Sequence, residues 1–186
     1  MGKFTVFLVL MTMIVVGASP MGAEACACGP DKGIKVASGT SEGGVKWSIH
    51  VARSKNFYSI DFESRWSDTN SSDVTGVSAW LTGKEIRNLT FFATTGSGLG
   101  NKRESDVSGA AGRRVKTLIV KMKSGERLRF SPKFAPRSVH DRIGRARTLR
   151  YFDVFYSNKE TPVLMTGLDG NGEVVDRFRS NRGSFN

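Results

Sequence analysis

The sequence predicts an all-β fold: one sandwich or barrel-like domain of roughly eight to ten strands, with one short basic helix. Three observations support this prediction. Many short stretches alternate apolar and polar residues with a period of two, which is typical of strands with one buried face. Turns rich in Gly, Asn and Asp separate them, and one stretch alone has helical spacing.

The first half of the chain contains two predicted strand pairs. Apolar residues alternate at 45–51 and at 58–62, on either side of a Ser-Lys-Asn turn, and this pattern predicts a hairpin. Further strands are expected at 74–81 and 86–94, joined by the turn 82–84. Between the two pairs, residues 64–72 are expected to form a polar loop that exposes Trp66.

In the second half, residues 95–112 are glycine-rich without periodicity and are interpreted as a flexible or functional loop. Strands are expected at 115–122, 127–130, 149–156, 163–168 and 174–175. Ser124-Gly125 and the stretch 169–172 are predicted hairpin turns. Residues 136–147 carry Val139, Ile143 and Ala146 at helical spacing, so the short helix is placed there.

The N-terminus is interpreted as a secretory signal peptide covering residues 1–25. Lys3 precedes an apolar run at 4–18, and Ala23 and Ala25 provide small residues before a cleavage site. Cleavage after Ala18 is an alternative. A retained anchor is disfavoured because the run is shorter than the roughly 20 residues needed to span a bilayer. We therefore expect an exported protein without a transmembrane span after cleavage, a flexible lead-in at 26–44 and a single β domain at 45–186.

The two cysteines, Cys26 and Cys28, are two residues apart at the predicted mature N-terminus. A local disulfide, or pairing between chains, is the favoured interpretation in an oxidising compartment. A lipid anchor on Cys26 is an alternative, although the preceding residues match a lipoprotein processing site poorly. Two thiolates alone are too few ligands for zinc, and the sequence implies no metal or cofactor.

The positive charge of the chain is concentrated in residues 113–150, which we call the basic segment. The segment holds thirteen basic and two acidic residues, a net charge of +11, and the whole chain also has a net charge of +11. Clustered Lys and Arg attract polyanions, and the arginine fork matches phosphate and carboxylate oxygens. A solvated hairpin face is the alternative, although such faces normally mix both signs. The predicted anion-binding residues are Arg113, Arg114, Lys116, Lys121, Lys123, Arg127, Arg129, Arg137, Arg142, Arg145, Arg147 and Arg150.

Several short motifs resemble catalytic or ligand-binding signatures, but their contexts differ from those signatures. Residues 39–43 match G-x-S-x-G, yet a strand follows them where a nucleophile elbow requires a helix. The glycines at 96–100 lack the Gly-Lys-Ser/Thr ending of a phosphate loop. His50 and His140 are the chain's two histidines, and no catalytic set surrounds either one in the sequence.

These observations predict a secreted, non-enzymatic β domain that binds an anionic surface or polymer through the basic segment. The expected partners are envelope or cell-wall polymers, anionic lipid headgroups or acidic polysaccharides. Nucleic acid is not expected, because an exported chain rarely meets it and aromatic residues are not interleaved with the basic ones. One alternative is a carbohydrate- or protein-binding module that uses Trp66 and the 95–112 loop. Another is a small secreted hydrolase that uses His50 or His140.

Overall fold

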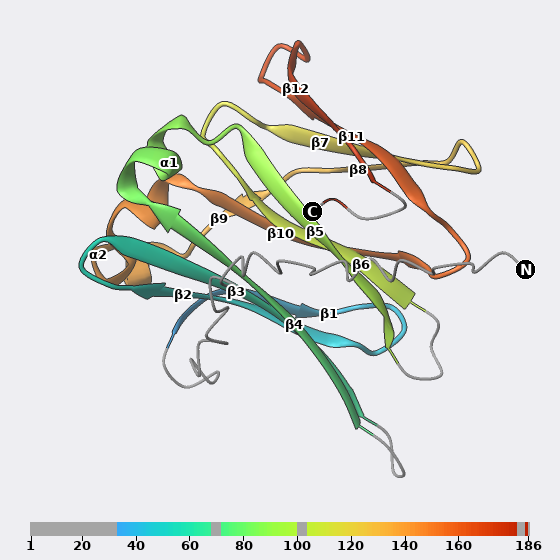
Figure 1. The fold of residues 1–186 in the computed structure, drawn as a ribbon, viewed down its shortest axis with the longest axis horizontal. Helices are drawn as coiled ribbons and strands as arrows, with labels where there is room; N and C mark the ends of the chain where they lie inside the picture. The colour runs from blue at the N-terminus through green and yellow to red at the C-terminus, as the bar shows by residue number, and fades with distance from the viewer. Residues whose placement is uncertain (1–32, 68–71, 100–103, 182–184, 186) are drawn as a thin grey trace, which may run out of the picture.

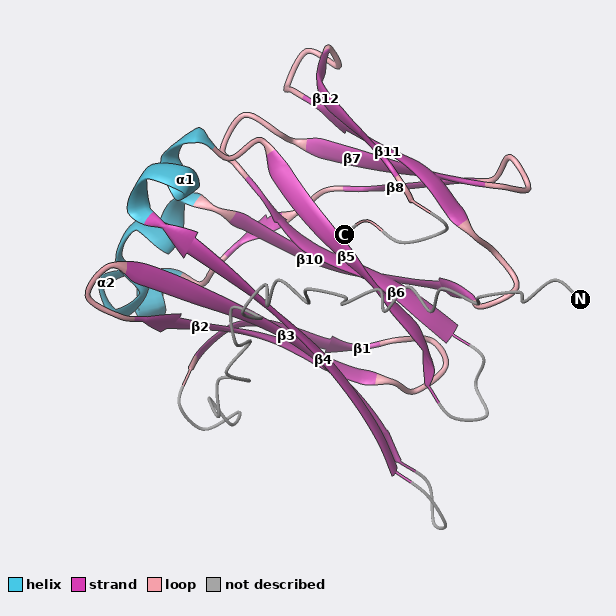
Figure 2. Ribbon diagram, viewed as in Figure 1, coloured by secondary structure: helices cyan, strands magenta, loops and turns pink. Residues whose placement is uncertain are grey.

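A computed structural model describes residues 33–67, 72–99, 104–181 and 185. Within these residues the chain forms twelve strands and two short α-helices, and the all-β prediction is confirmed with more strands than expected (Figures 1 and 2). The strands are β1 (Ile34–Thr40), β2 (Lys46–Arg53), β3 (Phe57–Ser67), β4 (Ser72–Thr82), β5 (Phe91–Leu99), β6 (Glu104–Ala111), β7 (Thr117–Met122), β8 (Arg127–Phe130), β9 (Lys133–Phe134), β10 (Arg150–Ser157), β11 (Pro162–Leu168) and β12 (Val174–Arg179).

The strands form three antiparallel sheets of four strands each. Sheet A has the order β1-β2-β3-β4, sheet B has the order β5-β6-β10-β9, and sheet C has the order β12-β11-β7-β8. Sheet B lies between the other two, so the sandwich has three layers (Figure 1). Tyr151 of β10 belongs to the core shared with sheet A, whereas its neighbour Phe152 belongs to the core shared with sheet C. Alternation along one strand therefore supplies both cores.

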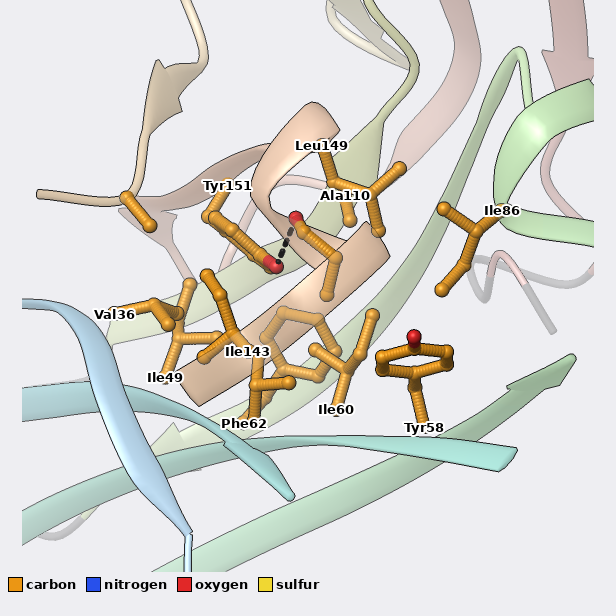
Figure 3. Close-up of a cluster of buried hydrophobic side chains, with 13 residues drawn as sticks. Val36, Ile49, Tyr58, Ile60, Phe62, Ile86, Ala110, Ile143, Leu149 and Tyr151 are labelled. Carbon is orange, nitrogen blue, oxygen red and sulfur yellow. Dashed lines mark hydrogen bonds between the residues drawn. The ribbon is translucent and has the colours of Figure 1, made fainter. Parts of the chain in front are cut away.

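The core between sheets A and B is closed at one end by helical turns. Ile49 of β2 and Ile60 of β3 are fully buried against Ile143, which belongs to a helical turn (Figure 3). The Tyr151 hydroxyl donates a hydrogen bond of 2.9 Å to the carbonyl of Ala146, so this buried phenol has its partner inside the core (Figure 3). Burial raises the pKa of Tyr151 above its ordinary value.

The helical turns occupy the region where the sequence predicts one short basic helix. They consist of η2 (Arg137–Val139), α2 (His140–Ile143) and η3 (Gly144–Thr148), with 3-10 turns on both sides of α2. Gly144, the first residue of η3, has a φ of +55°, a conformation that favours glycine, and the chain changes direction there after α2. No helix in the described ranges combines the length and the apolarity needed to cross a bilayer.

The predicted hairpins are confirmed. Strands β2 and β3 pair from Lys46 opposite Arg65 to Arg53 opposite Tyr58. Strands β7 and β8 meet at a turn in which Gly125 has a φ of +99°. The β11–β12 turn is held by the Asp169 carboxylate, which accepts hydrogen bonds from the backbone N–H groups of residues 171 and 173.

Three local predictions were wrong. The strand expected at 86–94 begins only at Phe91, because Thr82 and Glu85 form a capping box that starts α1 (Gly83–Asn88). Part of the predicted flexible lead-in is the edge strand β1, which pairs with β2. The loop expected at 95–112 is largely the end of β5 and the whole of β6, apart from residues 100–103, which lie outside the described ranges.

Candidate anion-binding surface

The outer face of sheet C gathers basic side chains from three strands. Residues directly opposite each other on antiparallel strands point to the same side of the sheet. One row runs Arg179, Leu164, Lys121, Arg127, and the next runs Arg177, Thr166, Ile119, Arg129. The interposed residues Leu118, Val120 and Met165 are fully buried on the inner side. We call the five cations of these two rows the basic face: Lys121, Arg127, Arg129, Arg177 and Arg179.

The basic face carries one sign of charge. All five side chains are exposed, and neither row contains an acidic residue. Among the described residues, none of the five forms an ion pair; the recorded pair is Arg65 with Glu63 on sheet A. Lys121 and Arg127 are direct cross-strand neighbours. Like charges placed opposite each other destabilise a sheet. Lys121 and Arg127 therefore repel each other, and an acidic residue in place of either one would remove this repulsion.

The basic face is only partly the surface that the sequence predicts. Lys121, Arg127 and Arg129 belong to the basic segment, and the sheet register brings them together. Arg177 and Arg179 lie outside the segment, and sequence reasoning missed them. Their period-two spacing after the β11–β12 turn is the signal that could have found them, because it places both on one face of a strand.

Most of the remaining cations of the basic segment lie elsewhere. Arg113, Arg114 and Lys116 are exposed between β6 and β7, and Lys123 is exposed in the β7–β8 turn. The helical turns present a further exposed group at one end of the sandwich: Arg137, Arg142, Arg145 and Arg147. The segment that is continuous in sequence is thus divided between the outer face of sheet C, the turns that border it and the helical end.

Arg150 differs from the other predicted anion-binding residues because it is packed inside the protein's own surface. Its guanidinium carbon lies 4.3 Å from the centroid of the Phe134 ring, the geometry of a cation–π contact. The side chain is half-buried, and its Nε has no hydrogen-bond partner among the described residues. Desolvation lowers the pKa of Arg150. We assign Arg150 to the packing of β9 on β10 and not to the basic face.

The placement of Trp66 on the surface was wrong. Residues 57–67 form one long strand, β3, and the Trp66 side chain is only 6% exposed. It packs with Val45 and Phe155 in a small apolar cluster. The residues that follow it, 68–71, lie outside the described ranges. Trp80, by contrast, is 49% exposed on the outer side of β4.

Strand β6 places polar groups inside the sandwich. Its side chains are buried because sheets A and C cover both faces of sheet B, and the sequence of β6 lacks strand periodicity because neither face meets solvent. The residues are small, and a β-carbon on Gly109 would lie 2.2 Å from the carbonyl oxygen of Phe92. Contact with both neighbouring layers therefore explains the composition that suggested a loop.

Asp106 of β6 is 6% exposed, and its carboxyl group accepts hydrogen bonds from neighbouring residues. Its Oδ2 accepts hydrogen bonds from the hydroxyls of Ser64, at 2.9 Å, and Ser108, at 3.4 Å. A β-carbon on Gly96 would lie 1.9 Å from Oδ1, so glycine is required opposite this carboxyl group. Burial raises the pKa of Asp106, although hydrogen bonds from Ser64, Gly96 and Ser108 oppose the rise.

Asp153 lies on β10 directly opposite Ser108. Its Oδ1 is shielded from solvent and has no hydrogen-bond partner among the described residues. Burial, and then the neighbouring charge of Asp106, raises the pKa of Asp153 well above its ordinary value. On the other face of β10, burial and then the Asp106 charge raise the pKa of Tyr156 to about 12. Burial thus shifts both carboxyl groups toward the protonated form relative to an exposed aspartate.

The G-x-S-x-G motif and the acidic residue Glu104 join sheets A and B. Ser41 lies in the turn between β1 and β2, with no helix after it, and its hydroxyl donates a hydrogen bond of 2.5 Å to Glu104. The backbone N–H of Gly43 donates to the same carboxylate at 2.9 Å. The carboxylate thus holds the turn against β6. This Ser41 is a structural residue and not a nucleophile at an elbow.

Neither histidine is aligned by a carboxylate. His50 Nε2 lies 3.1 Å from the Ser48 hydroxyl, but its Nδ1 has no partner among the described residues. Asp61 is the cross-strand neighbour of His50, yet it accepts a hydrogen bond from Ser59. A base needs an orienting partner to activate a serine. His140 Nε2 contacts the carbonyl of Ala135 at 3.0 Å.

Within the described ranges, no three His, Cys, Asp or Glu side chains gather where they could hold a metal ion. Cys26 and Cys28 lie outside these ranges, as do the predicted signal peptide and its cleavage site. No protein-family model matches the sequence, and no curated protein or solved structure matches it. Among the described residues, the basic face of sheet C is the candidate binding surface that the strand register supports.

Proposed function

We propose that this protein binds an extended anionic surface or polymer through the basic face of sheet C. The observation that carries the proposal is the cross-strand register, which places Lys121, Arg127, Arg129, Arg177 and Arg179 on one exposed face without an acidic neighbour in either row. A set of cations on one face concentrates polyanions by its summed field. The unrelieved repulsion between Lys121 and Arg127 is offset when an anion lies across them.

The shape of the face favours an extended partner over a small one. Neighbouring strands are about 4.8 Å apart, so the four strands spread the cations over about 14 Å. The central strand β11 contributes the half-buried Leu164 and Thr166 between the two groups of cations. Phosphate, carboxylate or sulfate groups repeated along a polymer, or packed in a lipid surface, would match this spread.

The proposal involves no catalysis, and it places the protein outside the cytoplasm. The location rests on the predicted signal peptide at residues 1–25. The carbohydrate-binding alternative loses its predicted aromatic because Trp66 is buried, and most of its predicted loop is strand β6. The hydrolase alternative gains no support from the surroundings of the two histidines.

The proposal is tested by binding of the mature protein to phosphatidylcholine vesicles with and without phosphatidylglycerol, over a salt series. Each basic residue near an anionic membrane contributes about 1 kcal/mol. The triple variant Arg127→Gln, Arg129→Gln and Arg177→Gln should therefore weaken binding by roughly a hundredfold.

The matched control is Lys35→Gln, Lys46→Gln and Arg65→Gln, which removes the same charge from the outer face of sheet A. Wild-type binding should fall steeply as salt rises, because salt screens exposed charges. Equal losses in the two triple variants would overturn the assignment to sheet C. Salt-independent binding, or no binding to vesicles or to an acidic polysaccharide, would overturn the proposed function.

A further inference from the structure

A second basic feature lies at the helical end of the sandwich, away from the basic face. The β2–β3 turn, the start of α1 and the turn η3 surround two adjoining hollows of about 360 and 290 Å³. Arg53, Tyr58 and Arg145 line both hollows. Three further cations also line the hollows: Lys55 and Lys84 the larger one and Arg147 the smaller one. We call the two hollows together the helical-end cleft.

Two of the shared residues, Tyr58 and Arg145, are held by specific contacts. The Tyr58 ring is 7% exposed, and its hydroxyl accepts a hydrogen bond of 3.3 Å from the backbone N–H of Arg145. The Arg145 guanidinium reaches the Gly83 carbonyl at 3.5 Å. A β-carbon on Gly144 would lie 3.1 Å from the Tyr58 hydroxyl and 3.2 Å from Nη1 of Arg53. Glycine at this position thus allows both groups to approach the backbone.

The cleft is electrostatically one-sided. No acidic residue lines either hollow, and none of its five cations forms an ion pair within the described ranges. The nearby acid Glu85 is committed to the capping box, where it accepts a hydrogen bond of 2.6 Å from the Thr82 N–H. This hydrogen bond lowers the pKa of Glu85. A cluster of cations without counter-charge in a concave site concentrates anions.

The polar groups of the cleft fit a tetrahedral oxyanion. Two guanidinium groups offer paired donors, and lysine adds a point charge. Tyr58 already accepts from Arg145, so its own hydrogen is available for a ligand oxygen. A water takes up about 30 Å³ in the liquid, so the larger hollow has room for a phosphate group together with a small organic substituent.

We propose that the helical-end cleft binds the phosphate dianion of a small phosphomonoester, with Arg53 and Arg145 as the principal ligands and Tyr58 as a hydrogen-bond donor. This site does not depend on the basic face, because the two share no residue. Several unpaired cations favour a dianion over a monoanion. We therefore expect the cleft to bind a phosphomonoester dianion more tightly than a singly charged phosphodiester.

Isothermal titration calorimetry with inorganic phosphate, phenyl phosphate and dimethyl phosphate, at constant ionic strength and pH 7.5, tests the proposal. Phosphate and phenyl phosphate should saturate one site, and dimethyl phosphate should bind at least about tenfold more weakly. Arg53→Gln, Arg145→Gln and Lys84→Gln should each raise the Kd, by at least about tenfold for the two arginines. Tyr58→Phe should raise it about threefold or more.

The matched control is Arg127→Gln with Arg129→Gln, which should leave phosphate binding within twofold while weakening vesicle binding. Conversely, Arg53→Gln should leave vesicle binding intact, so that the two proposals fail independently.

Phenyl phosphate affinity should fall from pH 7.5 to 5.5, because a phosphomonoester takes up its second proton near pH 6. Sulfate affinity should not change over that range. The absence of saturable phosphate binding, or an equal loss in the control, would overturn the proposal. Lys84 is exposed at the start of α1, so its variant tests the site even if an arginine variant fails to fold.

Discussion

The outer faces of sheets A and C belong to similar four-stranded antiparallel sheets, yet their charges are arranged differently. On sheet A both signs are present: Lys46 lies opposite Arg65, and Glu63 forms an ion pair with Arg65. The charged residues of that face are Lys35, Lys46, Asp61, Glu63 and Arg65. On sheet C the corresponding rows hold five cations and no acid. Sheet A is thus an ordinary solvated face, and sheet C departs from it within the same molecule.

The comparison bears on the alternative that the basic residues merely keep a hairpin soluble. The outer face of sheet A is polar without an excess of one sign: it has charges of both signs, a side-chain ion pair and a Ser59–Asp61 hydrogen bond of 2.8 Å. Both sheets place like charges opposite each other, Lys46 with Arg65 on sheet A and Lys121 with Arg127 on sheet C, which costs stability. On sheet A the acid Glu63 pairs with Arg65 and relieves this repulsion, whereas the two rows of sheet C contain no acid. A function that requires one sign of charge explains this unrelieved cost, and four sets of substitutions test the difference between the two faces.

Charge reversal should produce the largest difference between the faces. Arg127→Glu with Arg129→Glu should abolish detectable vesicle binding, a loss of at least roughly a hundredfold, because four units of charge are reversed on the binding face. Lys46→Glu with Arg65→Glu reverses the same amount on sheet A and should cost less than about threefold. Sedimentation with anionic vesicles measures both variants. Comparable losses would show that only the net charge of the protein matters.

The second prediction concerns the pH dependence of stability, which we assign to the buried carboxyl groups of Asp106 and Asp153 and not to the charged outer faces. The raised pKa values of Asp106 and Asp153 mean that the folded protein holds protons which the unfolded chain releases above the ordinary aspartate pKa of 3.8. Their contribution to stability is therefore complete below that pH, and it is lost as pH rises through the folded pKa values. Asp153→Asn should raise the Tm at pH 7, by about 2–4 °C for each kcal/mol regained.

At pH 4 the same variant should leave the Tm nearly unchanged. Vesicle binding should stay constant between pH 5 and 8, because guanidinium and ammonium groups remain charged there. Thermal unfolding from pH 4 to 7.5 and vesicle binding from pH 5 to 8 provide the two measurements. Parallel slopes of Tm against pH in wild type and variant would contradict the assignment of the titration to this carboxyl pair.

The third prediction makes sheet A resemble sheet C. Asp61→Asn with Glu63→Gln removes the two acids of that face and leaves its three cations. We expect a gain in vesicle affinity of about threefold to tenfold, because the second face then attracts anions as well. A matched removal of two acids away from the outer faces of sheets A and C, Asp141→Asn in α2 with Glu160→Gln between β10 and β11, controls for net charge. Equal gains in the two variants would mean that the arrangement of charge on the sheet has no effect.

The smallest effect is expected on stability alone. Arg127→Glu places an acid opposite Lys121, so it should raise the free energy of unfolding by about 0.2–1 kcal/mol. Urea unfolding at low salt measures this gain, and 1 M NaCl should remove most of it. A variant that is less stable than wild type at low salt would indicate that no repulsion exists between these two positions.

Much of the fold was predictable because period-two alternation reports directly on strands with one solvated face. Residues 45–51 and 58–62, and the turns at Gly125 and Gly172, were placed correctly for this reason. Strand β6 was missed because both of its faces are buried. Its glycines and serines are selected by contact with two neighbouring layers, which no local pattern reveals. The exposure of Trp66 was misjudged because β3 extends beyond its periodic part.

The all-β class, the hairpin turns and the concentration of positive charge in one segment follow from the order of the residues alone. Which cations act together depends on the folded protein, because strand register joins Arg177 and Arg179 to residues about fifty positions earlier in the chain. It also separated Arg145 from that face and brought it to Arg53 and Tyr58. Charge is fixed by composition, whereas the field that a ligand meets depends on distance, and distance is set by folding.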